Sequence, residues 1–343
     1  MQHNALKKEE QVLADDVKNF RTEKLDYITE LKRQRHEDRS RFSSERERML
    51  NGRYLLCALL GKGGFSEVWR AYDLKCLRTV AVKVHQLRPE WSEERKINYT
   101  RHATREYRIH SNLSHPRVVC LFDVFEIDVN SFATVLEYCD GEDLDRHLKK
   151  YISIPERDAR TWLLQILAGL KYLNTPSADD NRSAIIHYDL KPGNILFDSD
   201  GCVKITDFGL SKVIDNSEEG TSLELTSQGA GTYWYLPPEC FHRGPEPPRI
   251  SSKVDVFSLG VIYYQMLFGK RPIGDGMTQD QLLGSGLMLR LSGRDVEFPE
   301  KPIVSAGAKD FIRACLQPSQ IDRPDIRMLC THPYLRKDVS FKK

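Results

Sequence analysis

The run His187–Asn194 reads HYDLKPGN, and it says more about this chain than any other stretch. It places a carboxylate, an ammonium group and an amide close together, at Asp189, Lys191 and Asn194. One short loop can match a known pattern by chance. The interpretation therefore depends on whether other elements of the same pattern occur in the right order and at workable distances.

Two motifs upstream carry phosphate-binding chemistry. Leu60–Val68, LGKGGFSEV, lies between two apolar strands and predicts a hairpin. Its Gly61, Gly63 and Gly64 let backbone amides come close to phosphates. Val80–Lys83, VAVK, then supplies a strand lysine that can pair phosphates if a carboxylate on a nearby helix holds it. Glu106 is the best candidate for that carboxylate, because it lies late in the next helical stretch.

Three motifs follow downstream. Asp207-Phe208-Gly209 comes after the apolar strand CVKIT, Pro237-Pro238-Glu239 follows later, and Arg323 stands in the run IDRPD. In this order, the elements resemble those of a protein kinase, whose catalytic loop reads H-R-D-L-x-x-x-N. Two residues depart from the kinase pattern: Ser66 replaces the third loop glycine and Tyr188 replaces the arginine before the catalytic aspartate.

The resemblance implies a role for each matching residue. Asp189 accepts or orients the proton of the attacking hydroxyl, and Lys191 neutralises the γ-phosphate, as is typical of serine/threonine kinases. Thr232 is expected to hydrogen-bond with both, and Asn194 and Asp207 are expected to hold magnesium. Together with Lys83 and Glu106, these residues form the predicted catalytic set.

The resemblance also implies an ATP site and its supports. The connector Leu136–Asp143 is expected to meet the base, with backbone groups of Glu137 and Cys139 reading adenine. Asp255 is expected to bond backbone amides of the catalytic loop, and Glu239 to form a buried ion pair with Arg323. The full predicted ATP-binding set is Leu60, Gly61, Gly63, Val68, Ala81, Lys83, Leu136, Glu137, Cys139, Asp143 and Leu196.

Residues 1–50 contain neither Gly nor Pro and interleave charges of both signs, which predicts a long charged helix. Leu6, Leu13, Phe20 and Tyr27 recur every seven residues, but the polar residues that follow weaken the repeat. The segment is a possible coiled coil. It either packs on the following domain, frays in solution, or pairs with a partner helix, which would allow self-association.

Residues 51–338 are expected to form the kinase domain, with an α+β, two-lobed fold. A small lobe over about 51–138 is rich in short β-type runs and has one helical stretch, Ser92–Leu113. A larger lobe over about 141–338 has longer apolar helices, such as RDARTWLLQILAGLKYL. The long charged helix precedes both.

Composition supports an ordinary globular protein. The chain has 343 residues, 40% of them hydrophobic, and a formal net charge of +2, which gives no reason to expect nucleic acid as a direct partner. No apolar run approaches the roughly 18 residues that span a bilayer, and the start lacks a secretory h-region, so neither a membrane nor secretion is expected. The eight Cys form no CxxC pair, which argues against a zinc site or disulfide framework.

Four longer runs of sequence indicate which family of kinases the chain resembles. They are WSEERKINYTRHATREYRIH, FEIDVNSFATVLEYCDGEDLD, IIHYDLKPGNILF and LTSQGAGTYWYLPPECF. Together they resemble the Tousled-like serine/threonine kinases over almost all of residues 51–335. That resemblance implies ATP and Mg²⁺ as cofactors, a nuclear location, histone chaperones as protein substrates and dimers formed through coiled coils.

Two other functions remain open at this point. A pseudokinase would bind nucleotide or a partner without catalysis, and a scaffold would act through its N-terminal helix. Every group needed for phosphoryl transfer is present, and neither Ser66 nor Tyr188 contacts the transferred phosphoryl group directly. An active enzyme is therefore the favoured interpretation.

Overall fold

A computed structural model describes residues 2–177, 182–214, 222–224, 231–242, 244–291 and 296–336. The chain divides into two compact units, the first made of residues 1–96 and 121–138 and the second of residues 97–120 and 139–343. The first unit contains a β-sheet and the second is largely helical, so the predicted two-lobed α+β fold is confirmed. Residues 97–120, which the sequence placed in the small lobe, group with the helical unit.

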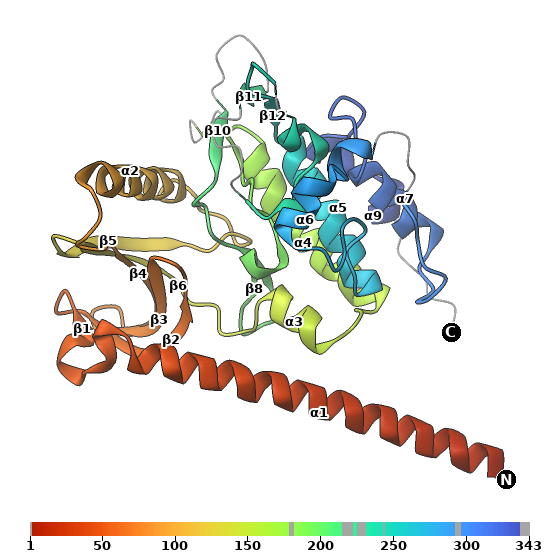
Figure 1. Ribbon diagram of the computed structural model, residues 1–343, viewed down its shortest axis with the longest axis horizontal. Helices are drawn as coiled ribbons and strands as arrows, with labels where there is room; N and C mark the ends of the chain where they lie inside the picture. The colour runs from red at the N-terminus through yellow and green to blue at the C-terminus, as the bar shows by residue number, and fades with distance from the viewer. Residues whose placement is uncertain are drawn as a thin grey trace. The chain divides into compact units, whose positions relative to one another are not determined.

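The first unit is built on a six-stranded antiparallel sheet in the order β1-β2-β3-β4-β6-β5 (Figure 1). Its core face carries Trp69, Val82 and Val135, which are fully buried and lie opposite one another in register. Side chains alternate between the two faces along each strand, so the residues between these belong to the other face. The strands are β1 (Met49–Leu50), β2 (Tyr54–Lys62), β3 (Ser66–Asp73), β4 (Arg78–Gln86), β5 (Leu121–Asp128) and β6 (Ser131–Glu137).

The N-terminal helix is shorter than the sequence predicted. Helix α1 spans Gln2–Asp38 and does not continue to residue 50. Two short 3₁₀ helices, Arg41–Ser43 and Glu45–Glu47, lead from it into β1. The side chain of Ser40 caps the first of these turns, and Phe42 is only 1% exposed in the core of the first unit. Burial of Phe42 outweighs the helical propensity of this charged sequence.

Helix α2 spans Glu93–His110 and lies within the predicted stretch Ser92–Leu113. The second unit is centred on α5, whose residues Val254–Tyr264 are all buried. Among the described residues, three two-stranded sheets accompany the helices: β7 (Ala184–Ile186) with β10 (Lys212–Ile214), β8 (Ile195–Phe197) with β9 (Val203–Ile205), and β11 (Ser222–Glu224) with β12 (Arg249–Ser251). The helices are α3 (Leu144–Lys150), α4 (Glu156–Asn174), α5 (Lys253–Phe268), α6 (Gln279–Ser285), α7 (Ala306–Cys315), α8 (Ile326–Leu329) and α9 (Pro333–Arg336).

None of the helices in the described ranges combines the length and the apolar character that crossing a membrane would require.

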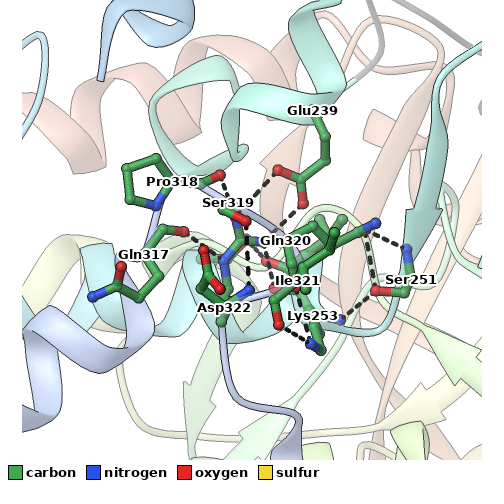
Figure 2. Close-up of polar contacts among 12 residues, drawn as sticks. Glu239, Ser251, Lys253, Gln317, Pro318, Ser319, Gln320, Ile321 and Asp322 are labelled. Carbon is green, nitrogen blue, oxygen red and sulfur yellow. Dashed lines mark hydrogen bonds and ion pairs between the residues drawn. The ribbon is translucent and has the colours of Figure 1, made fainter. Parts of the chain in front are cut away.

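A buried ion pair ties two distant segments of the second unit together. Arg323 is fully buried and donates to both carboxylate oxygens of Glu239, at 2.8 and 3.1 Å. The pair predicted from the sequence is therefore present. Arg323 also donates to the carbonyl oxygens of Gln317 and Lys253, at 3.0 Å each. Figure 2 shows Glu239 facing the loop of residues 317–322, where Lys253 donates to the carbonyl of Gln320.

We expect Arg323→Met to lower the free energy of unfolding by about 3–5 kcal/mol, because the Glu239 carboxylate would stay buried without its cation. Urea denaturation measures this loss. Lys149→Ala is the matched control: it breaks an exposed ion pair to Asp145, 2.5 Å long, and should cost about 0.3–0.5 kcal/mol. Equal losses in the two variants would contradict the structural role given to Arg323.

Candidate active site

Three neighbouring side chains hold the Asp189 carboxylate through both of its oxygens, the longest contact being from Asn194 Nδ2 to Oδ2 at 3.4 Å. Lys191 Nζ lies 2.5 Å from Asp189 Oδ2, and the Thr232 hydroxyl donates to Oδ1 at 2.9 Å. Lys191 Nζ also lies 3.3 Å from Thr232 Oγ1. The hydrogen bonds predicted for Thr232 are therefore present. Asp189 is only 8% exposed, so its orientation is set by the protein rather than by solvent.

Asp255 holds the backbone of the loop that carries Asp189 through hydrogen bonds. Asp255 is fully buried on α5 and accepts hydrogen bonds from the backbone amides of His187 and Tyr188, each 2.9 Å long. The Asn174 side chain donates to the same carboxylate at 2.8 Å. Burial raises the pKa of the Asp255 carboxyl, while these hydrogen bonds oppose that effect. The predicted bonds to catalytic-loop amides are confirmed.

Asn194 and Asp207, the two predicted metal ligands, lie on segments that are bonded to each other. Asn194 Nδ2 donates to the carbonyl oxygen of Asp189 at 2.8 Å, and the carbonyl of Asn194 accepts from the Thr206 amide at 3.1 Å. Asp207 takes a left-handed backbone conformation, with φ of 67°. A carboxylate and an amide oxygen, completed by phosphate oxygens, are ligands that suit magnesium.

Phe208 fixes the segment that carries Asp207. It is fully buried, and its ring lies 4.7 Å from the His110 ring and 5.3 Å from the His187 ring. His187 also contacts the Thr206 carbonyl oxygen at 2.9 Å through Nε2. The catalytic loop and the Asp207 segment are thus packed together through aromatic side chains.

Glu106 lies on α2 beside the same segment. A Cβ atom added to Gly209 would lie 3.4 Å from Glu106 Oε2 and 3.4 Å from Asp207 Oδ1, so the two carboxylates flank this glycine. The neighbouring Arg105 donates to the Ser211 carbonyl at 3.0 Å. The second unit therefore brings Glu106, Asp207 and the Asp189 loop into one region.

The first unit gathers a second set of predicted residues on one face of its sheet. Val68 lies opposite Lys83 in register, and Ala81 lies opposite Leu136. Lys83 and Ala81 are two residues apart on β4, so all four side chains share the face opposite the apolar core. Leu60 and Gly61 lie near the end of β2, and Gly61 pairs with Val68. Gly63 closes the hairpin by donating to the Ser66 carbonyl at 2.7 Å.

The predicted connector begins in the first unit and ends in the second. Glu137 is the last residue of β6, and Cys139 is half-buried. A Cβ atom on Gly141 would come within 2.7 Å of the Phe197 carbonyl oxygen, which explains the glycine. Asp143 caps α3 through the Arg146 amide at 2.8 Å and forms a β-bridge with Leu196, and burial raises the pKa of its carboxyl.

The sequence motifs did not identify Asn174 as a support of the site, and they did not show the contacts of Tyr188. Asn174 is the last residue of α4 and belongs to no motif, yet its side chain donates to Asp255. Tyr188 was recognised only as a departure from the kinase pattern. Tyr188 is 1% exposed, and its backbone is left-handed, with φ of 68°. The Lys212 ammonium lies 5.4 Å from the centre of its ring. Burial raises the pKa of the Tyr188 phenol and lowers the pKa of Lys212.

Comparison with known proteins places this sequence in a family. Residues 54–335 match the family model of the protein kinase domain. The chain is 51% identical to serine/threonine-protein kinase tousled-like 2 of Xenopus tropicalis over 346 residues, covering 98% of this chain and 48% of that protein. It is 51% identical to tousled-like 2 of Homo sapiens, covering 98% of this chain and 43% of the human protein.

Serine/threonine-protein kinase TOUSLED of Arabidopsis thaliana is also 51% identical, over 96% of this chain and 47% of the plant protein. The chain therefore spans about half the length of the curated relatives it matches. It belongs to the protein kinase family and, at about 50% identity over 98% of its length, groups with the Tousled-like serine/threonine kinases.

Proposed function

We propose that this protein transfers the γ-phosphate of ATP to Ser or Thr hydroxyls of protein substrates. The observation that carries the proposal is the hydrogen-bonded set of Asp189, Lys191 and Thr232, in which one carboxylate is held by an ammonium and a hydroxyl group. Asp189 is the group that orients the acceptor hydroxyl and takes its proton. Lys191 offsets charge on the transferred phosphoryl group.

The other predicted residues position the nucleotide in this proposal. Lys83 aligns the α and β phosphates with Glu106 as its carboxylate partner, and the glycine-rich hairpin covers the phosphates with backbone amides. Asn194 and Asp207 would hold Mg²⁺, which offsets phosphate charge when it is bound. The connector Leu136–Asp143 would receive adenine, with Leu196 lining the same site.

The resemblance to Tousled-like kinases supports a finer proposal. We infer that the acceptors are histone chaperones and that the enzyme works in the nucleus during chromatin assembly. An assay with ATP, magnesium and candidate chromatin proteins tests the substrate class. Phosphorylation of other proteins in preference to histone chaperones would contradict it.

We expect Asp189→Asn to lower kcat by roughly a hundredfold to ten-thousandfold, because the acceptor hydroxyl loses its base. Affinity for ATP and magnesium, measured by calorimetry, should stay close to that of the wild type, since Asp189 acts on the acceptor. Asp200→Asn, at an exposed loop carboxylate, is the control. Unchanged turnover in Asp189→Asn would favour the alternative in which this domain is a pseudokinase or scaffold.

A second expectation concerns regulation. Where kinases have arginine before the catalytic aspartate, a phosphate on the activation segment pairs with that guanidinium. Tyr188 has no charge and is buried, and the buried Lys212 lies near its ring. We expect substantial activity from the dephosphorylated protein.

Phosphatase treatment, checked by mass spectrometry, followed by initial-rate measurements provides the test. The candidate phosphate acceptors Thr221, Thr226 and Ser227 lie outside the described residues, as does the side chain of Ser222. Near-complete loss of the initial rate, restored by phosphate on one of these four residues, would show that the segment is gated despite Tyr188.

A third expectation concerns self-association through α1. Leu6, Leu13, Phe20 and Tyr27 are each 60–67% exposed, so this heptad series has an open apolar edge. We expect the chain of residues 1–343 to form dimers at micromolar concentration and its Leu13→Glu/Phe20→Glu variant to be monomeric by light scattering. Lys8→Glu is the control, because it makes the same change in net charge at an exposed position outside the series. Dimers that persist in the double variant would exclude this edge as the interface.

A further inference from the structure

The end of α1 and the segment between α1 and β1 are built into the first unit. We call residues 37–48 the N-terminal brace. Glu37 Oε2 accepts a hydrogen bond from the Leu59 amide at 3.2 Å, and the carbonyl of Arg48 accepts from the Leu56 amide at 2.8 Å. Phe42 packs edge-on against Trp69, with ring centres 6.3 Å apart. The brace precedes residue 54, where the match to the kinase family model begins.

The brace reaches one buried carboxylate, that of Glu67. Glu67 is 2% exposed and accepts hydrogen bonds from three donors. The Ser40 hydroxyl donates to Oε2 at 2.6 Å, and Trp69 Nε1 donates to the same oxygen at 3.3 Å. Lys62 Nζ lies 2.7 Å from Oε1. Ser40 is itself 5% exposed, so its hydroxyl belongs to the core and not to the surface.

Glu67 and Lys62 form the base of the glycine-rich hairpin. They lie opposite each other in the register of β2 and β3, on either side of the turn that carries Gly63. A Cβ atom added to Gly61 or Gly64 would meet no described atom within 4 Å, so the hairpin is open around these glycines. Its position therefore depends on contacts at its base and on Phe65, whose ring packs 4.6 Å from that of Trp91.

We propose that Ser40 is a positioning residue for the nucleotide. It orients Glu67, Glu67 holds Lys62, and this chain of contacts fixes the hairpin whose amides approach the phosphates. The inference rests on the proposed ATP-dependent activity. A buried hydrogen bond to a carboxylate is strong, and a loop already held in its binding geometry loses less entropy when ligand binds. Loss of the Ser40 hydroxyl should therefore weaken nucleotide binding and leave acceptor binding unchanged.

The experiment uses the full chain, five single variants and one double variant, Glu67→Gln being measured alone and together with Ser40→Ala. Ser40→Ala removes the hydroxyl, and Lys62→Met removes the cation that pairs with the buried Glu67 carboxylate, so the melting temperature of each variant is measured before its Kd. Lys62→Arg keeps the cation and is the conservative replacement. Ser43→Ala is the matched control, because Ser43 is an exposed serine of the same brace. Calorimetry measures the Kd for AMP-PNP with magnesium, and steady-state assays with casein measure kcat and both KM values.

We expect Ser40→Ala and Lys62→Met to raise the Kd for AMP-PNP and the KM for ATP by about threefold to tenfold. The KM for casein should not change, and Lys62→Arg and Ser43→Ala should behave as the wild type does. In a Glu67→Gln background, Ser40→Ala should have little further effect, because Ser40 acts through Glu67. If Ser40→Ala raised the Kd for AMP-PNP as much in the Glu67→Gln background as in the wild type, the proposal would be overturned.

Two further outcomes would also overturn it. One is a wild-type Kd for AMP-PNP in Ser40→Ala. The other is a lower melting temperature in Ser40→Ala with unchanged nucleotide affinity of the folded protein, which would assign Ser40 to stability alone. The Kd does not depend on phosphoryl transfer. A wild-type protein that binds AMP-PNP without phosphorylating casein or chromatin proteins would therefore refute the proposed activity while still testing the role of Ser40.

Discussion

The arrangement of the catalytic loop depends on one buried carboxylate, that of Asp255. It accepts hydrogen bonds from the amides of His187 and Tyr188 and from the side chain of Asn174, and it has no exposed surface. A buried carboxylate without partners would be very unfavourable, so the loop amides and the carboxylate require each other. Helix α5 is buried along most of its length. Asp255 therefore ties the loop that carries Asp189 to a helix that the core holds in place.

The segment that carries Thr232 is anchored at its far end by a second buried polar contact. Arg323 and Glu239 form a two-pronged ion pair, and Arg323 satisfies its remaining donors with backbone carbonyls. Such a pair contributes less to net stability than its Coulomb energy suggests, since both groups lose their hydration. The main effect of the ion pair is on the position of the chain. It fixes where the Pro237–Glu239 turn lies, and that turn lies five residues after Thr232.

The first unit also contains a buried carboxylate whose hydrogen bonds join segments that are distant in the sequence. Glu67 is buried beside Trp69 and is satisfied by Ser40, Lys62 and the Trp69 indole. One of these donors comes from the N-terminal brace, so a segment outside the matched kinase domain completes a hydrogen-bond network inside it. The hairpin is open around Gly61 and Gly64, which suits the proposed approach of its amides to phosphates. Support therefore comes from the base of the hairpin.

The sequence by itself determined the features that act over short distances along the chain. Asp189, Lys191 and Asn194 lie in one loop, so their spacing identifies them without knowledge of the fold, and the motifs on each side identified the two-lobed architecture. The ends of α1 and the contacts of Ser40, Phe42 and Tyr188 were decided only by the tertiary structure. Charged residues without Gly or Pro favour a helix to residue 50, but propensity is weak compared with burial of one phenylalanine. Ser40 and Glu67 are 27 residues apart, and no local pattern marks them as partners. Folding brings them together, because a buried carboxylate must find its hydrogen-bond donors wherever the packed chain places them.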